Sequence, residues 1–257
     1  MSKPWLASYP SGVPAEIDSN RYRSLAHLAE ESFAKFAART AYVQMDKSLS
    51  FGELDRQSRA FGAWLQQRAG LKRGDRVAIM MPNVPQYPVA VAAVLRAGLV
   101  VVNVNPLYTP RELEFQLKDS GAKAIVIIEN FAITLQKCIK QTQVKHIVMC
   151  AMGDMLHWPK SAVVNFVVRN MKNLVPEFHL FGAVKFNQAL RIGSEVRFRP
   201  PTVSAEDIAL LQYTGGTTGI SKGAVLLHRN VIANLLQSEA WNEPVMKRVP
   251  ANEQATS

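Results

Sequence analysis

The segment Tyr213–Gly223 (YTGGTTGISKG) contains the residue types that hold phosphate groups in proteins. Its inner glycines permit positive φ angles, so successive backbone N–H groups can point toward one centre and form an anion-binding nest. These glycines are Gly215, Gly216 and Gly219. Hydroxyl groups surround them at Thr214, Thr217, Thr218 and Ser221, and Lys222 adds a positive point charge that suits a phosphate. The segment therefore predicts a site for a polyphosphate ligand.

The spacing of this segment differs from that of two other nucleotide-binding motifs. Ser221 directly precedes Lys222, so the segment lacks the Gly-x4-Gly-Lys spacing of a Walker A loop, and it contains no Gly-x-Gly-x-x-Gly sequence. A flexible hairpin turn with a stray lysine is the alternative interpretation. Because a turn needs one or two glycines and no cluster of hydroxyls, the composition favours a binding site.

The elements that must position this segment follow a regular alternation. Short apolar runs begin near residues 76, 99, 124 and 146, and a helical pattern separates each run from the next. Two of the helices begin with capping-box pairs, Ser50 with Glu53 and Thr109 with Glu112. Apolar strands joined by helices indicate an α/β fold with a doubly wound, mostly parallel sheet. A later strand, 207–212, runs directly into the glycine-rich segment.

The pattern divides the chain into a leading segment and one incomplete domain. Residues 1–23 contain three prolines and predict an extended leading segment, and residues 24–257 predict the domain. Within the domain, 24–150 carry the β/α alternation and 151–205 form an irregular insert that is both apolar and basic. Residues 206–241 form the hairpin around the glycine-rich segment and a helix, and 242–257 form an unstructured end.

Composition excludes several other classes of protein. The chain has 257 residues, 48% of them apolar, and a formal net charge of +10, which indicates a globular protein. Cys138 and Cys150 predict neither a metal site nor a redox pair, and His27, His146, His157 and His179 lack ligand spacing. No more than two basic residues are adjacent, so we expect no nucleic-acid partner.

With these residues in view, the sequence resembles a known family. Tyr213–Gly223 is similar to the phosphate-loop signature of the adenylate-forming, AMP-binding enzymes. Within that family the whole chain resembles bacterial long-chain fatty-acid–CoA ligases. The resemblance is carried also by residues 5–18, 98–109 (GLVVVNVNPLYT), 162–168 (AVVNFVV) and 227–230 (LHRN). It implies the N-terminal part of the adenylate-forming fold.

The resemblance implies a two-step reaction with ATP, Mg2+ and coenzyme A. A long-chain fatty-acid carboxylate attacks the α-phosphorus of ATP and releases pyrophosphate, and the coenzyme A thiol then displaces AMP. Thr214 and Lys222 would be catalytic, and ATP would be bound by Tyr213, Thr214, Gly215, Gly216, Thr217, Thr218, Gly219, Ser221, Lys222 and Gly223. His228 would lie near the substrate tunnel, unless it is a packed or helix-capping histidine.

Members of this family are about twice as long as this chain. The Mg2+ ligand and the adenine pocket would then belong to later motifs, so we expect the 257-residue chain to be the N-terminal half and to show little turnover. An aryl- or short-chain acyl-CoA ligase fragment is one alternative. A non-catalytic, truncated remnant that at most binds nucleotide is the other.

Two expectations concern location and partners. The N-terminus lacks the features of a signal peptide and no apolar run is long enough to span a bilayer, so the expected compartment is the cytoplasm. Between Trp158 and Arg199 there are seven basic residues against two acidic ones. The apolar and basic stretch Lys160–Lys172 suits either the surface of the cytoplasmic membrane or a buried helix with solvated ends. A homodimer is left open.

Overall fold

The computed structural model describes residues 3–214 and 221–247. Its centre is a seven-stranded sheet in the order β7-β6-β5-β3-β4-β8-β9. All neighbouring pairs are parallel except β8 and β9, which form an antiparallel hairpin. The strands are β3 (Arg76–Met80), β4 (Val100–Asn103), β5 (Ala124–Ile128), β6 (His146–Cys150), β7 (Val184–Lys185), β8 (Ile208–Thr214) and β9 (Lys222–Leu227). The predicted α/β fold with a mostly parallel sheet is confirmed.

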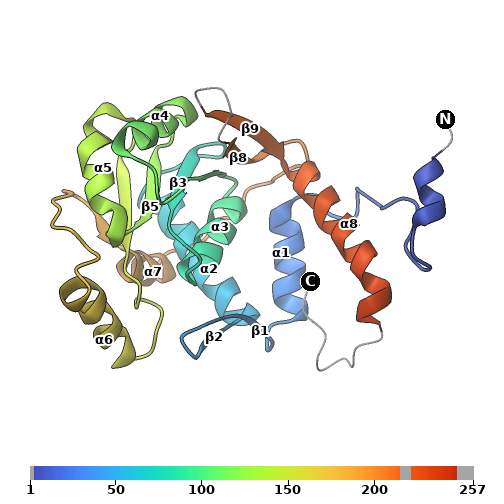
Figure 1. Ribbon diagram of the computed structural model, residues 1–257, viewed down its shortest axis with the longest axis horizontal. Helices are drawn as coiled ribbons and strands as arrows, with labels where there is room; N and C mark the ends of the chain where they lie inside the picture. The colour runs from blue at the N-terminus through green and yellow to red at the C-terminus, as the bar shows by residue number, and fades with distance from the viewer. Residues whose placement is uncertain (1–2, 215–220, 248–257) are drawn as a thin grey trace.

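Helices cover both faces of the sheet (Figure 1). Successive strand residues point to opposite faces, so Val77 and Ile79 join one core while Ala78 and Met80 join the other. The first core also contains residues of α1 (Leu25–Lys35), α2 (Phe51–Gln67), α3 (Gln86–Arg96) and α7 (Phe186–Ser194). The second contains residues of α4 (Pro110–Ser120) and α5 (Ala132–Cys138). Burial on both faces explains why these strands are continuous apolar runs.

Local sequence fixes where two of these helices begin. Ser50 and Thr109 each accept a hydrogen bond from the backbone N–H three residues later, and the Glu53 and Glu112 carboxylates bond back to the cap residues. Both capping boxes are therefore present. Helix α4 ends at Gly121, whose φ of 63° a residue with a side chain rarely adopts.

The insert 151–205 is more regular than the sequence indicated. It contains α6 (Lys160–Phe166), a π-helical turn (Val167–Met171), β7 and α7. Helix α7 packs closely on α2 at Gly193. The approach leaves no room for a side chain there, since a Cβ on Gly193 would lie 1.9 Å from the Ala60 carbonyl oxygen. The basic and amide residues of the insert interrupt its apolar pattern, so the sequence did not predict these helices. Most of these polar residues lie at outward-facing positions. The sheet also gains β7 from the insert.

The two ends of the chain differ from the expectation as well. Helix α8 (His228–Met246) continues past Trp241, so the expected unstructured end 242–257 is wrong for its first residues; 248–257 lie outside the described residues. The leading segment is not wholly extended, since Pro4–Ser8 form a 3-10 helix. Tyr9 packs edge-on against Trp241 with 5.3 Å between ring centroids. This contact brings the residue after the 3-10 helix beside α8.

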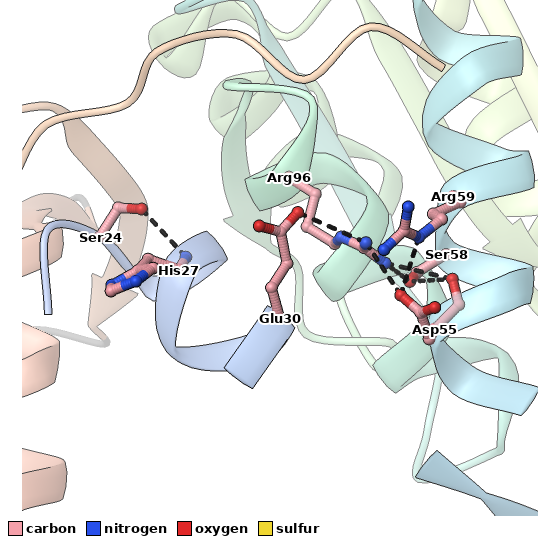
Figure 2. A network of polar contacts seen from close by, with 7 residues as sticks. All are labelled: Ser24, His27, Glu30, Asp55, Ser58, Arg59 and Arg96. Carbon is pink, nitrogen blue, oxygen red and sulfur yellow. Dashed lines mark hydrogen bonds and ion pairs between the residues drawn. The ribbon is translucent and has the colours of Figure 1, made fainter. Parts of the chain in front are cut away.

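A buried arginine joins α1, α2 and α3 (Figure 2). The Arg96 side chain has no exposed surface, and its guanidinium lies 2.9 Å from Asp55 and 3.4 Å from Glu30. It also donates to the Ser58 hydroxyl at 2.7 Å. Burial lowers the pKa of Arg96, and the two carboxylates oppose that shift. Arg96 of α3 thus bridges a carboxylate of α1 to a carboxylate and a hydroxyl of α2.

Two further strands form a separate small sheet. Strands β1 (Thr40–Gln44) and β2 (Lys47–Ser50) pair antiparallel between α1 and α2. Short 3-10 turns at Glu129–Phe131 and Ile139–Gln141 flank α5.

Candidate functional site

The β8–β9 hairpin holds the two ends of the glycine-rich segment together. Thr214 pairs with Lys222, and Tyr213 pairs with Gly223. The Ser221 hydroxyl also donates a hydrogen bond of 2.8 Å to the Thr214 carbonyl. Since β8 is parallel to β4, this end of the hairpin lies at the carboxyl edge of the parallel strands, where open α/β sheets bind ligands.

Tyr213 anchors the base of this hairpin. Its ring is buried in the second core, and its hydroxyl donates to Oδ2 of Asp119, near the end of α4, at 2.5 Å. Burial, followed by the contact with Asp119, raises the tyrosine pKa. A Cβ on Gly223 would lie 2.9 Å from the Tyr213 ring, so the close approach of β9 requires glycine there. The side chain is therefore occupied within the protein, and its role toward ATP stays a prediction.

Sequence reasoning missed a polar cluster beside the hairpin. The Asn103 amide, at the end of β4, donates to Gln212 Oε1 at 3.0 Å, and the Tyr87 hydroxyl donates to Asn103 Oδ1 at 2.9 Å. Gln116 Nε2 donates to the Asn103 carbonyl at 2.7 Å. The Gln116 Oε1 atom is buried and has no partner among the described residues. The available signal was a polar residue at the end of one apolar strand, Asn103, and another near the end of a second, Gln212.

The predicted site residues divide into three groups. Tyr213, Thr214, Ser221, Lys222 and Gly223 are brought together at the hairpin, with Thr214 and Lys222 exposed. Gly215, Gly216, Thr217, Thr218 and Gly219 lie outside the described residues, so their contributions stay predictions.

His228 is the third group, and the structure does not bring it to the loop. It follows β9, whose length places it roughly 20 Å from Lys222. It is buried, and its Nδ1 accepts from the Leu25 N–H at 3.1 Å. Burial lowers its pKa to about 4, against a smaller opposing effect of Asp207. This arrangement ties α8 to the start of α1, and the role near a substrate tunnel stays a prediction.

The described part of the chain contains neither a cluster of metal-ligating side chains nor a membrane-spanning helix. Within 3–214 and 221–247, no three His, Cys, Asp or Glu side chains are grouped so that they could hold a metal ion. In the same part of the chain, no helix combines the length and the apolar character needed to cross a membrane.

Comparison with known proteins identifies the family. The sequence profile of the family described as AMP-binding enzyme matches residues 29–253. The chain belongs to this family. It is 54% identical over 246 residues to the long-chain-fatty-acid–CoA ligase of Salmonella typhimurium. The aligned region covers 96% of this chain and 44% of that protein. The Bacillus subtilis protein of the same description is 35% identical, covering 93% of this chain and 42% of that protein. This chain therefore spans less than half the length of these relatives.

Solved structures show the same fold. A long-chain-fatty-acid-CoA ligase from Archaeoglobus fulgidus is 25% identical, with a TM-score of 0.68 over 90% of this chain and 42% of that chain. An anthranilate CoA ligase in complex with anthranoyl-AMP has a TM-score of 0.67 at 20% identity, over 83% of this chain and 37% of that chain. The similarity to the second protein concerns the fold alone.

Proposed function

We propose that this chain provides the triphosphate-binding loop for the ATP-dependent activation of a long-chain fatty acid to an acyl-adenylate and then to acyl-CoA. The observation that carries the proposal is the pairing of Thr214 with Lys222, which closes the glycine-rich segment at the carboxyl edge of the sheet. A hydroxyl and an ammonium group are thereby held on either side of the loop entrance.

Each residue has a defined task in this proposal. The backbone N–H groups of the loop and the hydroxyls of Thr214, Thr217 and Thr218 would hold the β- and γ-phosphates. Lys222 would stabilise the negative charge that develops as the bond between the α- and β-phosphates breaks and pyrophosphate leaves. Mg2+ would neutralise part of the phosphate charge, and its protein ligand is not assigned to this chain. Tyr213, Ser221 and Gly223 would keep the loop ends in position.

The similarity to named long-chain ligases at 50–54% identity supports a long-chain fatty acid over an aryl or short-chain acid. The aryl-acid ligase with the same fold is only 20% identical, so it gives no weight to that alternative. Coenzyme A would be the second substrate. We further propose that the chain alone supports little or no turnover, because it spans less than half of these relatives.

Binding of nucleotides and pyrophosphate tests the phosphate-binding role without requiring turnover. Titration calorimetry on the purified chain with Mg2+ should show binding of ATP and pyrophosphate and much weaker binding of AMP, which lacks the β- and γ-phosphates. Equal affinity for ATP and AMP would contradict the proposed loop contact. Exchange of labelled pyrophosphate into ATP, assayed with oleate, benzoate and acetate, would measure residual adenylation and its preferred acid.

A further inference from the structure

A pocket at the end of α2 is lined by three arginine side chains. It lies where the last turn of α2 meets the segment that follows α7, and its volume is about 230 Å3. We call it the arginine pocket, and its lining consists of Gln67, Arg68, Val196, Arg197 and Arg199. Within the described residues, this lining includes no acidic and no aromatic side chain. The pocket therefore presents positive charge to whatever enters it.

The positive charge of the arginine pocket is not balanced by acidic side chains. In the part of the chain that the structure describes, no carboxylate forms an ion pair with any of the three guanidinium groups. Other basic residues nearby are paired, since Arg191 lies 3.3 Å from Glu195 and Arg73 lies 2.7 Å from Asp207. Like charges gathered at one hollow repel each other. The carboxyl end of α2 offsets this repulsion only in part, because it carries about half an elementary negative charge.

Contacts around Phe198 hold the segment that carries two of the three arginines. Gln66 donates from Nε2 to the Arg199 carbonyl at 2.9 Å, and its Oε1 accepts from the Arg199 N–H at 3.1 Å. The Phe198 ring packs against the first core, and a Cβ on Gly62 would lie 2.8 Å from it. Since adjacent side chains of an extended segment point to opposite sides, Arg197 and Arg199 both turn toward the pocket. The pocket is thus formed before any ligand binds.

The arginine pocket lies at the opposite edge of the sheet from the glycine-rich loop. Arg68 caps the end of α2, and a short connection then leads to the start of β3, which places the pocket at the amino edge of the parallel strands. Pro201 lies at the same edge, because its Cγ would lie 2.7 Å from a Cβ on Gly98, just before β4. Strand β8 runs from this edge over seven residues, roughly 20 Å, to Thr214. The two sites are therefore separate.

We propose that the arginine pocket binds a small ligand through a diphosphate group. Guanidinium groups present planar pairs of N–H donors that match phosphate oxygens, and two adjacent phosphates offer enough oxygens for three arginines. The pocket is several times larger than the volume of one water in the liquid, about 30 Å3, so it has room for a small anion. A nucleic acid is the poorer occupant, because the described lining offers no aromatic ring on which a base could stack.

Titration calorimetry with pyrophosphate in the absence of Mg2+ tests this proposal. The Lys222→Ala chain serves as the starting protein, because that change weakens binding at the proposed phosphate loop. It should bind pyrophosphate, and bind inorganic phosphate less tightly. Arg197→Gln and Arg199→Gln, each added to it, should reduce the affinity for pyrophosphate about tenfold, since each removes a charge-assisted contact. Arg56→Gln is the matched control, because it removes the same charge from an exposed position of α2 roughly 18 Å before Arg68.

The outcomes separate the alternatives. Failure to bind pyrophosphate, or equal losses for Arg56→Gln and Arg199→Gln, would overturn the proposal. Binding of single-stranded RNA or of phosphatidylglycerol vesicles that Arg197→Gln weakens, without binding of pyrophosphate, would overturn it in favour of a larger polyanion. Retained circular dichroism in the arginine variants would show that their losses concern the pocket and not folding. The arginine losses decide the outcome whether or not the loop binds phosphate, so failure here is distinguishable from failure of the proposed function.

Discussion

The hydroxyl of Tyr213 lies 2.5 Å from Oδ2 of Asp119, and this contact joins the last turn of α4 to the base of the β8–β9 hairpin. The residues that enter the glycine-rich loop are therefore fixed from the helix layer as well as from the sheet. A rigid entrance holds Thr214 and Lys222 in register before any ligand arrives, which reduces the ordering that binding requires.

Removing the Tyr213 hydroxyl should loosen this entrance. We expect Tyr213→Phe to lower the free energy of unfolding by about 1–2 kcal/mol, as for other single hydrogen bonds to a carboxylate. Urea unfolding checks this value. The double variant Tyr213→Phe with Asp119→Asn should lose less stability than the sum of the two single losses, because both changes remove the same contact. Strict additivity would show that the two groups do not interact, and Tyr42→Phe on the exposed β1 strand is the control.

Gly223 should not tolerate a side chain while Tyr213 keeps its ring. A Cβ there would lie 2.9 Å from that ring, so we expect Gly223→Ala to destabilise the protein by about 1–3 kcal/mol. Tyr213→Leu removes the ring, so Gly223→Ala should cost less in the Tyr213→Leu background than in the parent chain. Val225→Ala on the exposed side of the same strand should cost much less. Equal stability of Gly223→Ala and the parent chain would contradict the packing described.

Much of the fold could be predicted from the sequence, and the exceptions have physical reasons. Strands β3 to β6 are predictable because burial on both faces makes them uniformly apolar. Strand β1 is mostly exposed and strand β2 mixes exposed, half-buried and buried positions, so neither is a uniformly apolar run. Helix α7 was not predicted because it lies in a segment whose basic residues interrupt the apolar pattern. For the candidate site, glycine and hydroxyl density predicts a phosphate loop, and that role stays a prediction. The contact between Asn103 and Gln212 joins residues 109 apart in the chain, which local patterns cannot reveal.

The buried Arg96 should matter more to stability than an exposed arginine beside it. Arg96→Ala would leave a cavity, remove the partner of Glu30 and leave Asp55 with Arg59 alone, so we expect a loss of about 2–5 kcal/mol, chiefly from the cavity. Arg96→Met should lose less, since it fills the space. Arg59→Ala, which removes an exposed ion pair with Asp55, should lose under about 1 kcal/mol. Comparable losses for Arg59→Ala and Arg96→Ala in urea unfolding would refute this ranking.

His228 should make the protein less stable as the solution becomes acidic. Its pKa is about 4 in the folded state, below the ordinary 6.5, so the unfolded chain takes up the proton first. The stabilisation is complete above about pH 6.5 and declines as the pH falls toward 4, by up to about 3 kcal/mol in total. Urea unfolding at several pH values measures the slope.

The variant His228→Asn isolates the contribution of His228 to the pH dependence of stability. His228→Asn keeps an acceptor for the Leu25 N–H and removes the titration, so the slope between pH 6.5 and 5 should flatten. His146 has a lowered pKa too and contributes a slope of the same sign, which is why the difference between variants is the relevant quantity. Exposed His157→Asn is the control. An unchanged slope in His228→Asn would show that His228 does not cause the acid sensitivity.

The most direct measurement concerns Lys222 and the polyphosphate. Titration calorimetry of the purified chain with Mg2+ and ATP should give measurable heat, and Lys222→Ala should weaken the affinity about tenfold or more, because a charge-assisted contact to phosphate is worth roughly 1.5–3 kcal/mol. Lys137→Ala should bind like the parent chain. Unchanged affinity in Lys222→Ala, or no binding of ATP or pyrophosphate by the folded parent chain, would contradict the phosphate-binding assignment.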